Sequence, residues 1–315
     1  MKSWGCDPEL MLKDGDTYIS AINVVPASPE HRLEIQGHEF YYDNVLAEFA
    51  MKPATSKKEA LDNLRECLEL YVEVVNPCKL VAQAYQTYPD NIWDKLDPDT
   101  KEPIAATAGC AVDRCGYLVK NMEAPKDIIQ KSTDRSGGGH VHLGDDRLLR
   151  DYGLYLAPSA VLMDLFIGIP SLFLDKDPTS AQRRRIYGQA GRFRICSYGM
   201  EYRTLGNFWL KSPKLTSLVY DLCEFVCDLA CSDEIHKHVT VDLDKYVSAK
   251  PAGAYEYKTF DAKKLKAVIN KSNTKKSGCE LYDLTLSLLP KGLSADINNL
   301  LYENKDYDLY KEWNL

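Results

Sequence analysis

Four short segments of the chain carry two polar or charged side chains at positions i and i+2. In a β-strand these two positions point to the same face of the sheet. If the segments are strands of one sheet, they form a dense charged surface that is too costly to bury as a core. Such a surface is typical of a site for metal ions and phosphate. The pairs are Asp7 with Glu9, His140 with His142, Arg192 with Arg194, and Glu201 with Arg203.

The histidine pair lies in the segment GGGHVHLG, directly after three glycines. Glycine lets the backbone approach a ligand closely. A single histidine is usually a hydrogen-bonded core residue, but two on one face after such a run favour a role with a metal or a phosphate. We therefore treat His140 and His142 as candidate site residues.

Five arginines occur within twelve residues in the segment RRRIYGQAGRFR. The planar guanidinium group suits the clamping of phosphate oxygens, and the glycines between the arginines permit a close approach. A solvated basic face is the alternative. We interpret the segment as a phosphate-binding one.

The carboxylates of the set have simpler interpretations as well. Asp7 and Glu9 flank a proline and could be solvated acids of an edge strand. Glu201 and Arg203 could form an ordinary ion pair. Glu48, in contrast, lies between alanine and phenylalanine in the apolar segment DNVLAEF, an unusual position for a solvated acid.

Both strands and helices are expected among the elements that position these residues. The first fifty residues contain alternating and aromatic-rich segments that are typical of strands. Ser56 and Glu59 then form a capping box, and apolar residues at helical spacing behind it predict a helix over 57–75. A second amphipathic pattern predicts a helix over 214–231.

Strands and helices are interleaved without a regular βαβ order, which favours an α+β fold with a largely antiparallel sheet. No linker is strong enough to divide the chain. We therefore predict a single domain over residues 1–315, with the chemical motifs within 1–210 and a helical C-terminal region over 211–315.

Composition excludes several classes of protein. With 45% hydrophobic and 27% charged residues, the 315-residue chain is neither disordered nor fibrous. Its 39 basic and 46 acidic side chains give a net charge of −7, which repels polyphosphate, so we predict no nucleic-acid partner. The chain has no P-loop, GxGxxG, GxSxG or HExxH motif. A bound nucleotide would therefore be held by metal and arginine.

The apolar stretch 154–174 is long enough to span a bilayer. Asp164 lies at its centre and Pro158 and Pro170 bracket it, so the stretch predicts a buried core helix from Pro158 to Gly168. The chain begins without the apolar segment of a signal peptide. We predict a cytoplasmic protein with reduced thiols and no membrane contact.

Cys223, Cys227 and Cys231 recur every four residues and so share one face of the predicted helix over 214–231. A zinc site is conceivable. Structural zinc usually takes its ligands from loops, however, and free cysteine is commonly buried. We adopt core packing as the interpretation.

The order of the motifs resembles the phage-type amidoligases, or COOH–NH2 ligases of type 2, which are built on the glutamine synthetase fold. The resemblance covers roughly residues 1–210. It implies a curved, mainly antiparallel sheet with helices on the convex side and with Mg²⁺ and ATP on the concave face. The motifs, in order, are GCDPEL, DNVLAEF, GGGHVHLG, YGQAGRFR and YGMEYRTLGNFWL.

The resemblance also implies a role for each residue. Glu9, Glu48, His140 and Glu201 are similar to the metal ligands of the family, with Asp7 as a further ligand or a neighbouring acid. His142 is similar to the histidine near the nucleotide phosphates, and Arg203 to the arginine that faces the reacting acyl phosphate. Arg185, Arg192 and Arg194 are the candidates for contact with the phosphates, and Arg194 also for charge stabilisation during catalysis.

The expected activity is an ATP- and Mg²⁺-dependent ligation of a carboxylate donor to an amine acceptor through an acyl phosphate. Such a protein would work in the cytoplasm, in the host cytoplasm if a phage encodes it. One alternative is a metal-dependent hydrolase that uses His140 and His142. Phosphotransfer to a guanidino group is another alternative, and a binding protein without activity is a third.

Overall fold

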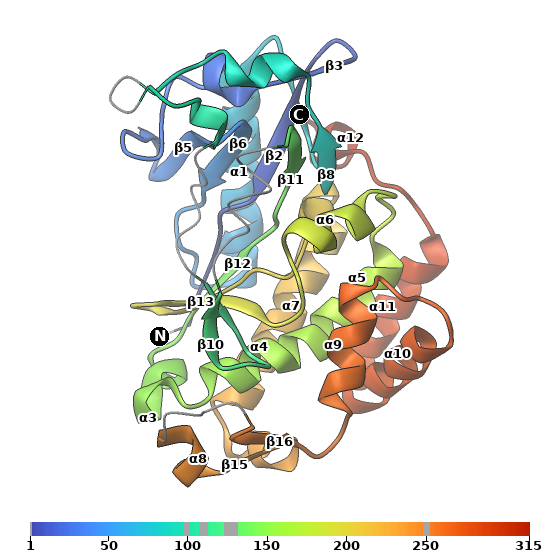
Figure 1. Ribbon diagram of the computed structural model, residues 1–315. Helices are drawn as coiled ribbons and strands as arrows, with labels where there is room; N and C mark the ends of the chain where they lie inside the picture. The colour runs from blue at the N-terminus through green and yellow to red at the C-terminus, as the bar shows by residue number, and fades with distance from the viewer. Residues whose placement is uncertain (1, 98–100, 107–112, 123–131, 248–252) are drawn as a thin grey trace.

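A computed structural model describes residues 2–97, 101–106, 113–122, 132–247 and 253–315 (Figure 1). Twelve of the described strands form two six-stranded antiparallel sheets. The first sheet has the order β1 (Ser3–Cys6), β12 (Val141–Gly144), β14 (Gly199–Tyr202), β13 (Arg192–Cys196), β9 (Asp113–Cys115) and β10 (Lys120–Met122). The second has the order β3 (Thr17–Ile19), β2 (Glu9–Asp14), β6 (Leu46–Ala50), β5 (His38–Asp43) and β4 (Leu33–Ile35), and β7 (Lys79–Val81) pairs with β2.

The N-terminal segment joins the two sheets. β1 pairs with β12 in the first sheet and β2 pairs with β6 in the second. Between them the backbone stays bonded on both sides, because Cys6 O accepts a hydrogen bond from Met51 N at 3.0 Å and Glu9 N donates to Gly138 O at 2.9 Å. The sheets thus continue one another as a strongly curled antiparallel layer, which confirms the predicted α+β fold.

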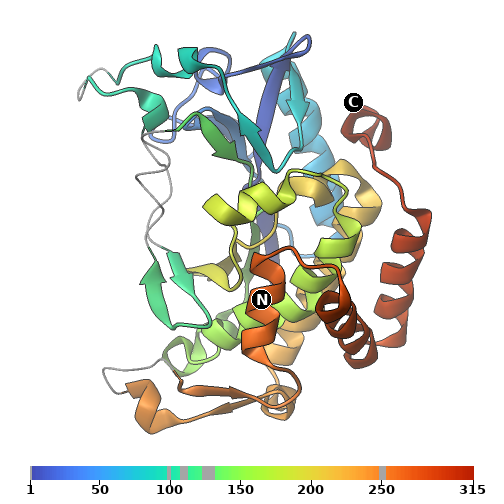
Figure 2. The ribbon, with the colours of Figure 1, turned by 45° about the vertical axis from the view of Figure 1, so that its right-hand side comes forward.

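Helices cover one face of this layer. The predicted helix over 57–75 is confirmed as α1 (Lys57–Val75), and its cap, Ser56 Oγ, accepts a hydrogen bond from Glu59 N at 3.2 Å. The predicted helix over 214–231 is α7 (Pro213–Ala230), which packs against α1. Figure 2 shows these helices on one side of the strands.

The apolar stretch forms one long buried helix. It runs through α4 (Leu156–Met163), a π-helical turn (Asp164–Gly168) and α5 (Ile169–Leu174), so the predicted end at Gly168 is wrong. Pro170 does not end the helix, because the wider π turn before it already departs from the α-helical hydrogen-bond pattern. Of its most apolar window, 94% is buried within the fold, as predicted for a core helix.

Smaller elements complete the molecule. β8 (Tyr85–Thr87) pairs with β11 (Asp134–Ser136), and β15 (Val239–Val241) with β16 (Tyr255–Tyr257). The C-terminal helices pack on α5 and α7. The other helices are α3 (Arg150–Gly153), α6 (Ser180–Ile186), α8 (Leu243–Val247), α9 (Ala262–Asn270), α10 (Lys276–Leu288), α11 (Lys291–Glu303) and α12 (Leu309–Trp313).

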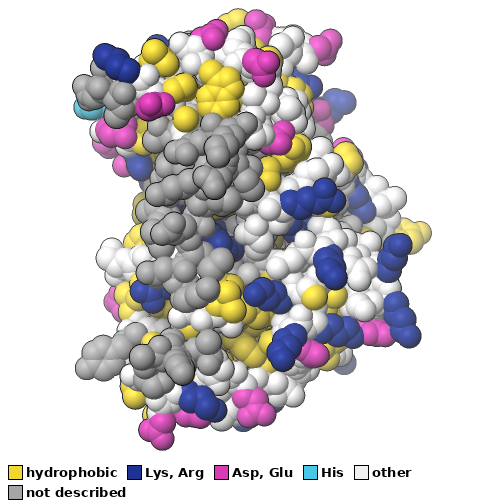
Figure 3. Space-filling view, viewed as in Figure 1, with side chains coloured by type: hydrophobic (Ala, Val, Ile, Leu, Met, Phe, Trp, Pro, Cys, Tyr) yellow, Lys and Arg dark blue, Asp and Glu magenta, His cyan; other side chains and the backbone are white. Residues whose placement is uncertain are grey.

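The surface charge is unevenly distributed despite the acidic total. Figure 3 shows lysine and arginine side chains gathered on the side of the molecule where α6, α9 and α10 lie. Lys263, Lys271, Lys275 and Lys276 are exposed in this region. The acidic site residues, in contrast, lie within the curved sheet.

Candidate active site

Strand register sets the first row of site residues. His142 on β12 lies directly opposite Glu201 on β14, and Glu201 lies opposite Arg194 on β13. Arg194 Nη1 is 2.8 Å from Glu201 Oε2. The alternate positions, such as Tyr202, face the helices: Tyr202 donates a hydrogen bond to Asp164 of the π turn. The row therefore lies on the face of the sheet away from the helices.

A second row lies next to the first. Asp7 Oδ1 is 3.4 Å from His140 Nδ1 and 2.9 Å from His142 Nε2. His140 Nδ1 is in turn 3.4 Å from Glu201 Oε1. Arg203, two residues after Glu201, bonds the same Oε1 atom through Nη1. His140 with His142, and Glu201 with Arg203, are thus neighbours on one face, as their i, i+2 spacing predicted. Glu9, the predicted neighbour of Asp7, pairs with Glu48 on the second sheet.

Two residues of this region were missed from the sequence. Asp113 Oδ2 accepts a hydrogen bond from Arg192 Nε at 2.8 Å and lies 3.7 Å from Arg203 Nε. The hydroxyl of Tyr187 accepts a hydrogen bond from Arg203 Nε at 2.8 Å. Asp113 has no motif around it, and its position follows only from the pairing of β9 with β13, which no local pattern specifies.

A third group of acids lies on the second sheet. Glu9 and Glu48 are directly opposite each other on β2 and β6, and both are buried. Asp43, at the end of β5, has a carboxylate oxygen within 4.8 Å of oxygens of both. Glu9 Oε2 accepts from Gly138 N at 2.6 Å, and Glu48 Oε1 accepts from the Tyr41 hydroxyl at 2.8 Å. Both donors are uncharged, so neither hydrogen bond brings a positive charge to these acids.

Burial and repulsion shape the titration of these acids. Burial, together with the charge of Asp43, raises the pKa of Glu9 to about 7. Burial, Asp43 and Asp7 likewise raise the pKa of Glu48 well above its usual range. The charge of Asp7 contributes to the raised pKa of Glu48. The acids of the second sheet and the acids around the histidines therefore influence one another electrostatically.

The two histidines differ in charge. Burial and the nearby Arg203 lower the pKa of His140 to about 4, so its ring is neutral at physiological pH. Burial opposes the charged form of His142, but the carboxylate of Asp7 outweighs it and raises the pKa. The interaction with His142, together with hydrogen bonds from both histidines, in turn keeps the pKa of Asp7 well below its usual range despite burial. A neutral imidazole such as His140 can serve as a metal ligand.

The glycines before the histidines serve the protein itself. A Cβ atom on Gly138 would lie 2.4 Å from His140 Nε2, and one on Gly139 would lie 2.4 Å from Gly206 O. The sequence had suggested that these glycines let the backbone approach a ligand closely. The close approach is instead made by the imidazole and by the neighbouring chain.

The arginines of the basic segment separate into different places. Arg194 is partly exposed beside Glu201, and Arg192 is buried against Asp113. Arg185 is exposed on α6, and among the described residues no hydrogen bond or ion pair joins it to the site. Arg183, which the sequence analysis did not select, is buried and donates to Gly137 O at 2.9 Å and Thr204 O at 2.8 Å.

The donor set fits a hard divalent cation. Glu9, Asp43 and Glu48 form one cluster of carboxylates, and Asp7, His142 and Glu201 form another with ligand atoms within 4.8 Å of one another. Mg²⁺ prefers oxygen ligands and keeps several waters or phosphate oxygens in its shell. Buried like charges of this kind are unfavourable without a counterion.

Residues 132–315 match the family model described as phage phiEco32-like COOH.NH2 ligase-type 2. The match spans more than half of the chain. The chain belongs to this family. The family name indicates the joining of a carboxylate to an amine, so this ligase is an enzyme that forms C–N bonds. No curated protein matches the chain.

The matched segment, residues 132–315, differs from the range of roughly 1–210 over which the sequence motifs resemble the family. It includes the C-terminal helices, in which no motif of the family was found from the sequence. It also includes the histidine pair and the strands β13 and β14. Asp7, Glu9 and Glu48 lie before the matched segment, so their assignment rests on their position in the fold.

Proposed function

We propose that this ligase activates a carboxylate with ATP, as an acyl phosphate, and transfers the acyl group to an amine. The observation that carries the proposal is the single face on which the acids, histidines and arginines gather. An amide does not form in water from a carboxylate and an amine without activation. Phosphoryl transfer needs positioning and charge neutralisation more than it needs a protein nucleophile, and this face offers both.

The acids are the proposed magnesium ligands. Glu9 and Glu48, with Asp43 beside them, would hold one ion, and Glu201 with Asp7 and the neutral His140 would hold another. Mg²⁺ bound there would neutralise charge on the phosphates. The raised pKa of Glu9 and of Glu48 supports this assignment, because a cation relieves the repulsion that causes the shift.

The arginines are the proposed partners of the transferred group. The guanidinium of Arg194 is partly exposed and bonded to Glu201. A phosphate oxygen can therefore reach it without any rearrangement of buried residues. Arg203 is held between Glu201 and Tyr187 and is fixed in direction. Fixed cationic donors of this kind stabilise negative charge that develops in a transition state. His142, whose pKa is raised by Asp7, would add a further donor near the phosphates.

Capture with hydroxylamine tests the reaction. The protein is incubated with ATP, MgCl₂, hydroxylamine and, separately, single amino acids and dipeptides as carboxylate probes. We expect a hydroxamate to form together with ADP and phosphate, and to be lost in Arg194→Gln. Release of ADP with a phosphorylated guanidino compound and no hydroxamate would favour the phosphotransferase. Tightly held zinc with amide hydrolysis in the absence of ATP would favour the hydrolase.

A further inference from the structure

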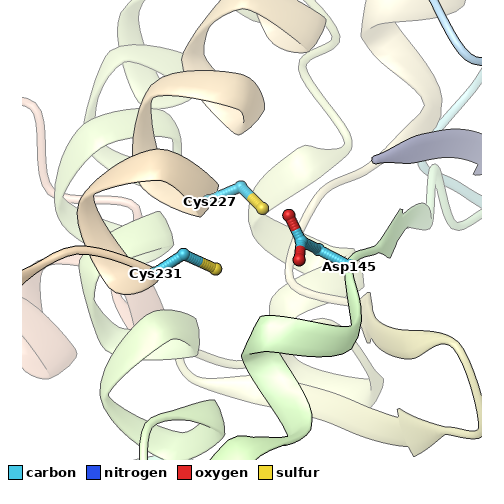
Figure 4. A group of neighbouring side chains, drawn as sticks. All are labelled: Asp145, Cys227 and Cys231. Carbon is cyan, nitrogen blue, oxygen red and sulfur yellow. The ribbon is translucent and has the colours of Figure 1, made fainter. Parts of the chain in front are cut away.

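We propose that Asp145, Cys227 and Cys231 form a second metal site, one that binds a single thiophilic divalent cation such as Zn²⁺. The three side chains point toward one another (Figure 4). Their ligand atoms all lie within 4.8 Å of one another. The site is independent of the proposed ATP chemistry.

The fold brings these residues together from two distant segments. Cys227 lies in the last turn of α7 and Cys231 is the C-cap residue one turn later, so the two side chains share a face of the helix end. Asp145 directly follows β12 and caps the short helix that begins after it. All three are buried: the exposed fraction is 2% for Cys227, 6% for Cys231 and 3% for Asp145. The sequence analysis could not include Asp145, because 82 positions separate it from Cys227.

The chemistry of the group suits zinc. Two thiolates on one tetrahedral Zn²⁺ ion lie about 3.8 Å apart, given Zn–S bonds of about 2.3 Å, and a carboxylate oxygen is a usual third ligand. The observed ligand atoms, all within 4.8 Å of one another, are compatible with this geometry. Three protein ligands leave one position for water. The thiolates exclude Mg²⁺, which prefers oxygen ligands.

Arg147 provides the outer contact that such a ligand usually has. Its Nε donates to Asp145 Oδ1 at 2.9 Å and its Nη2 lies 2.6 Å from Oδ2. This contact lowers the pKa of Asp145 and keeps the carboxylate ionised. Ligating carboxylates are commonly oriented by a hydrogen bond of this sort. Half of the Arg147 side chain is exposed, so it can adjust when a cation arrives.

Cys223 shows what simple core packing looks like on the same helix face. It is fully buried one turn before Cys227, and burial alone raises its pKa. The expectation of core packing therefore suits Cys223. Cys227 and Cys231 also lie in the buried core, as expected, but the carboxylate of Asp145 in addition has an oxygen within 4.8 Å of both their sulfur atoms.

Cobalt titration tests the site directly. The reduced, metal-free full-length protein is titrated with Co²⁺, and sulfur-to-cobalt charge-transfer absorption is recorded. We expect one equivalent to give a thiolate band with the visible spectrum of a tetrahedral ion, and Zn²⁺ to displace it. The band should be lost in the double variant Cys227→Ala with Cys231→Ala, and kept in the matched control Cys223→Ala.

A second variant separates metal binding from folding. Asp145→Asn keeps both thiols and nearly the same shape, and should weaken Co²⁺ binding by at least about tenfold while circular dichroism stays unchanged. The proposal is overturned if the wild-type protein gives no thiolate band. It is equally overturned if the band persists in the double cysteine variant, because other thiols, such as the exposed Cys279, would then be the ligands.

Discussion

Glu9 and Glu48 face each other in the interior, where two carboxylates repel and neither is solvated. We expect Glu9→Gln to stabilise the metal-free protein at pH 8, by about 1–3 kcal/mol, because an amide removes one of the repelling charges. We also expect Mg²⁺ to raise the melting temperature of the wild-type protein, and Glu9→Gln to reduce this rise. Thermal unfolding with EDTA and with Mg²⁺ measures both effects.

Glu34→Gln is the matched control for this change. Glu34 is exposed on β4, so its replacement should leave the stability within about 0.5 kcal/mol and should keep the response to Mg²⁺. If Glu9→Gln destabilises the metal-free protein or still responds to Mg²⁺ like the wild type, Glu9 is not a magnesium ligand.

Arg194 and Arg185 offer a second comparison at the scale of single residues. Arg194 lies at Glu201, and Arg185 is exposed on α6. We expect Arg194→Gln to lower the turnover of ATP by about 10²–10³-fold, in line with the loss of one fixed donor to developing charge. Arg185→Gln should change turnover less than about twofold. ADP release measures the turnover. If both variants lose activity equally, Arg185 also contributes to phosphate binding, contrary to this expectation.

Individual site residues were predictable from the sequence where they follow the i, i+2 alternation of a β-strand. Alternation alone placed His140 with His142 and Glu201 with Arg203 on one face, and the contacts of Asp7 with both histidines and of Glu201 with Arg203 agree with it. Asp113, Asp43 and Tyr187 reach the site only through pairing and packing between segments far apart in the chain. Asp43 and Tyr187 begin the motifs DNVLAEF and YGQAGRFR, but no local pattern shows that their side chains reach the site, and Asp113 lies in no motif.

The π turn ties the core helix to the strand that carries Glu201. Asp164 Oδ1 accepts hydrogen bonds from Tyr202 at 2.6 Å and Thr204 at 3.1 Å, and Oδ2 accepts from Tyr117 at 2.8 Å. Tyr202 and Thr204 alternate with Glu201 and Arg203 along the chain. The carboxylate thus holds the back of the strand whose front is the site, and π turns often lie at such positions.

Burial raises the pKa of Asp164 from its ordinary value of 3.8 to about 7. A raised pKa means that the folded protein binds the proton more tightly, so the stability from this group is lost as pH rises from about 4 to about 7. Asn resembles the protonated acid. We therefore expect the wild-type protein to lose about 2–4 kcal/mol more than Asp164→Asn between pH 4 and pH 8.

Urea unfolding of both proteins across this pH range measures the difference. The exposed Asp16→Asn serves as the control and should follow the wild-type curve. Parallel curves for the wild type and Asp164→Asn would contradict the account of the π turn.

Element boundaries were predictable where caps or periodicity marked them. Ser56 fixed the start of α1, and apolar spacing fixed α7 to within a residue. The long core helix was predicted too short because its sequence contains glycine and proline at the expected end. Tertiary burial of an almost wholly apolar stretch outweighs those local signals.

At the scale of the whole molecule, the C-terminal helices are tied to the catalytic sheet. Trp313 on α12 is buried, its Nε1 donates to Leu210 O at 2.7 Å, and Arg65 of α1 donates to its carbonyl at 3.2 Å. The helical region over 211–315 therefore shares a core with the segments that carry the motifs. This packing supports the prediction of a single domain over 1–315.

Trp313→Ala should accordingly lower the free energy of unfolding by about 3–5 kcal/mol, with one transition for the whole chain. Tyr302→Ala is the control on α11, because Tyr302 is 92% exposed and its loss should cost less than about 0.5 kcal/mol. Two separate transitions in calorimetry would show that the C-terminal helices fold apart from the sheet.

The most direct test of the central claim is a crystal structure of the protein with Mg²⁺ and a non-hydrolysable ATP analogue. The account predicts magnesium ions about 2.0–2.1 Å from carboxylate oxygens of Glu9, Glu48 and Glu201, with the triphosphate over the curved face. Arg194 should contact a phosphate oxygen. A nucleotide bound elsewhere, with these carboxylates still bonded only to protein, would contradict it.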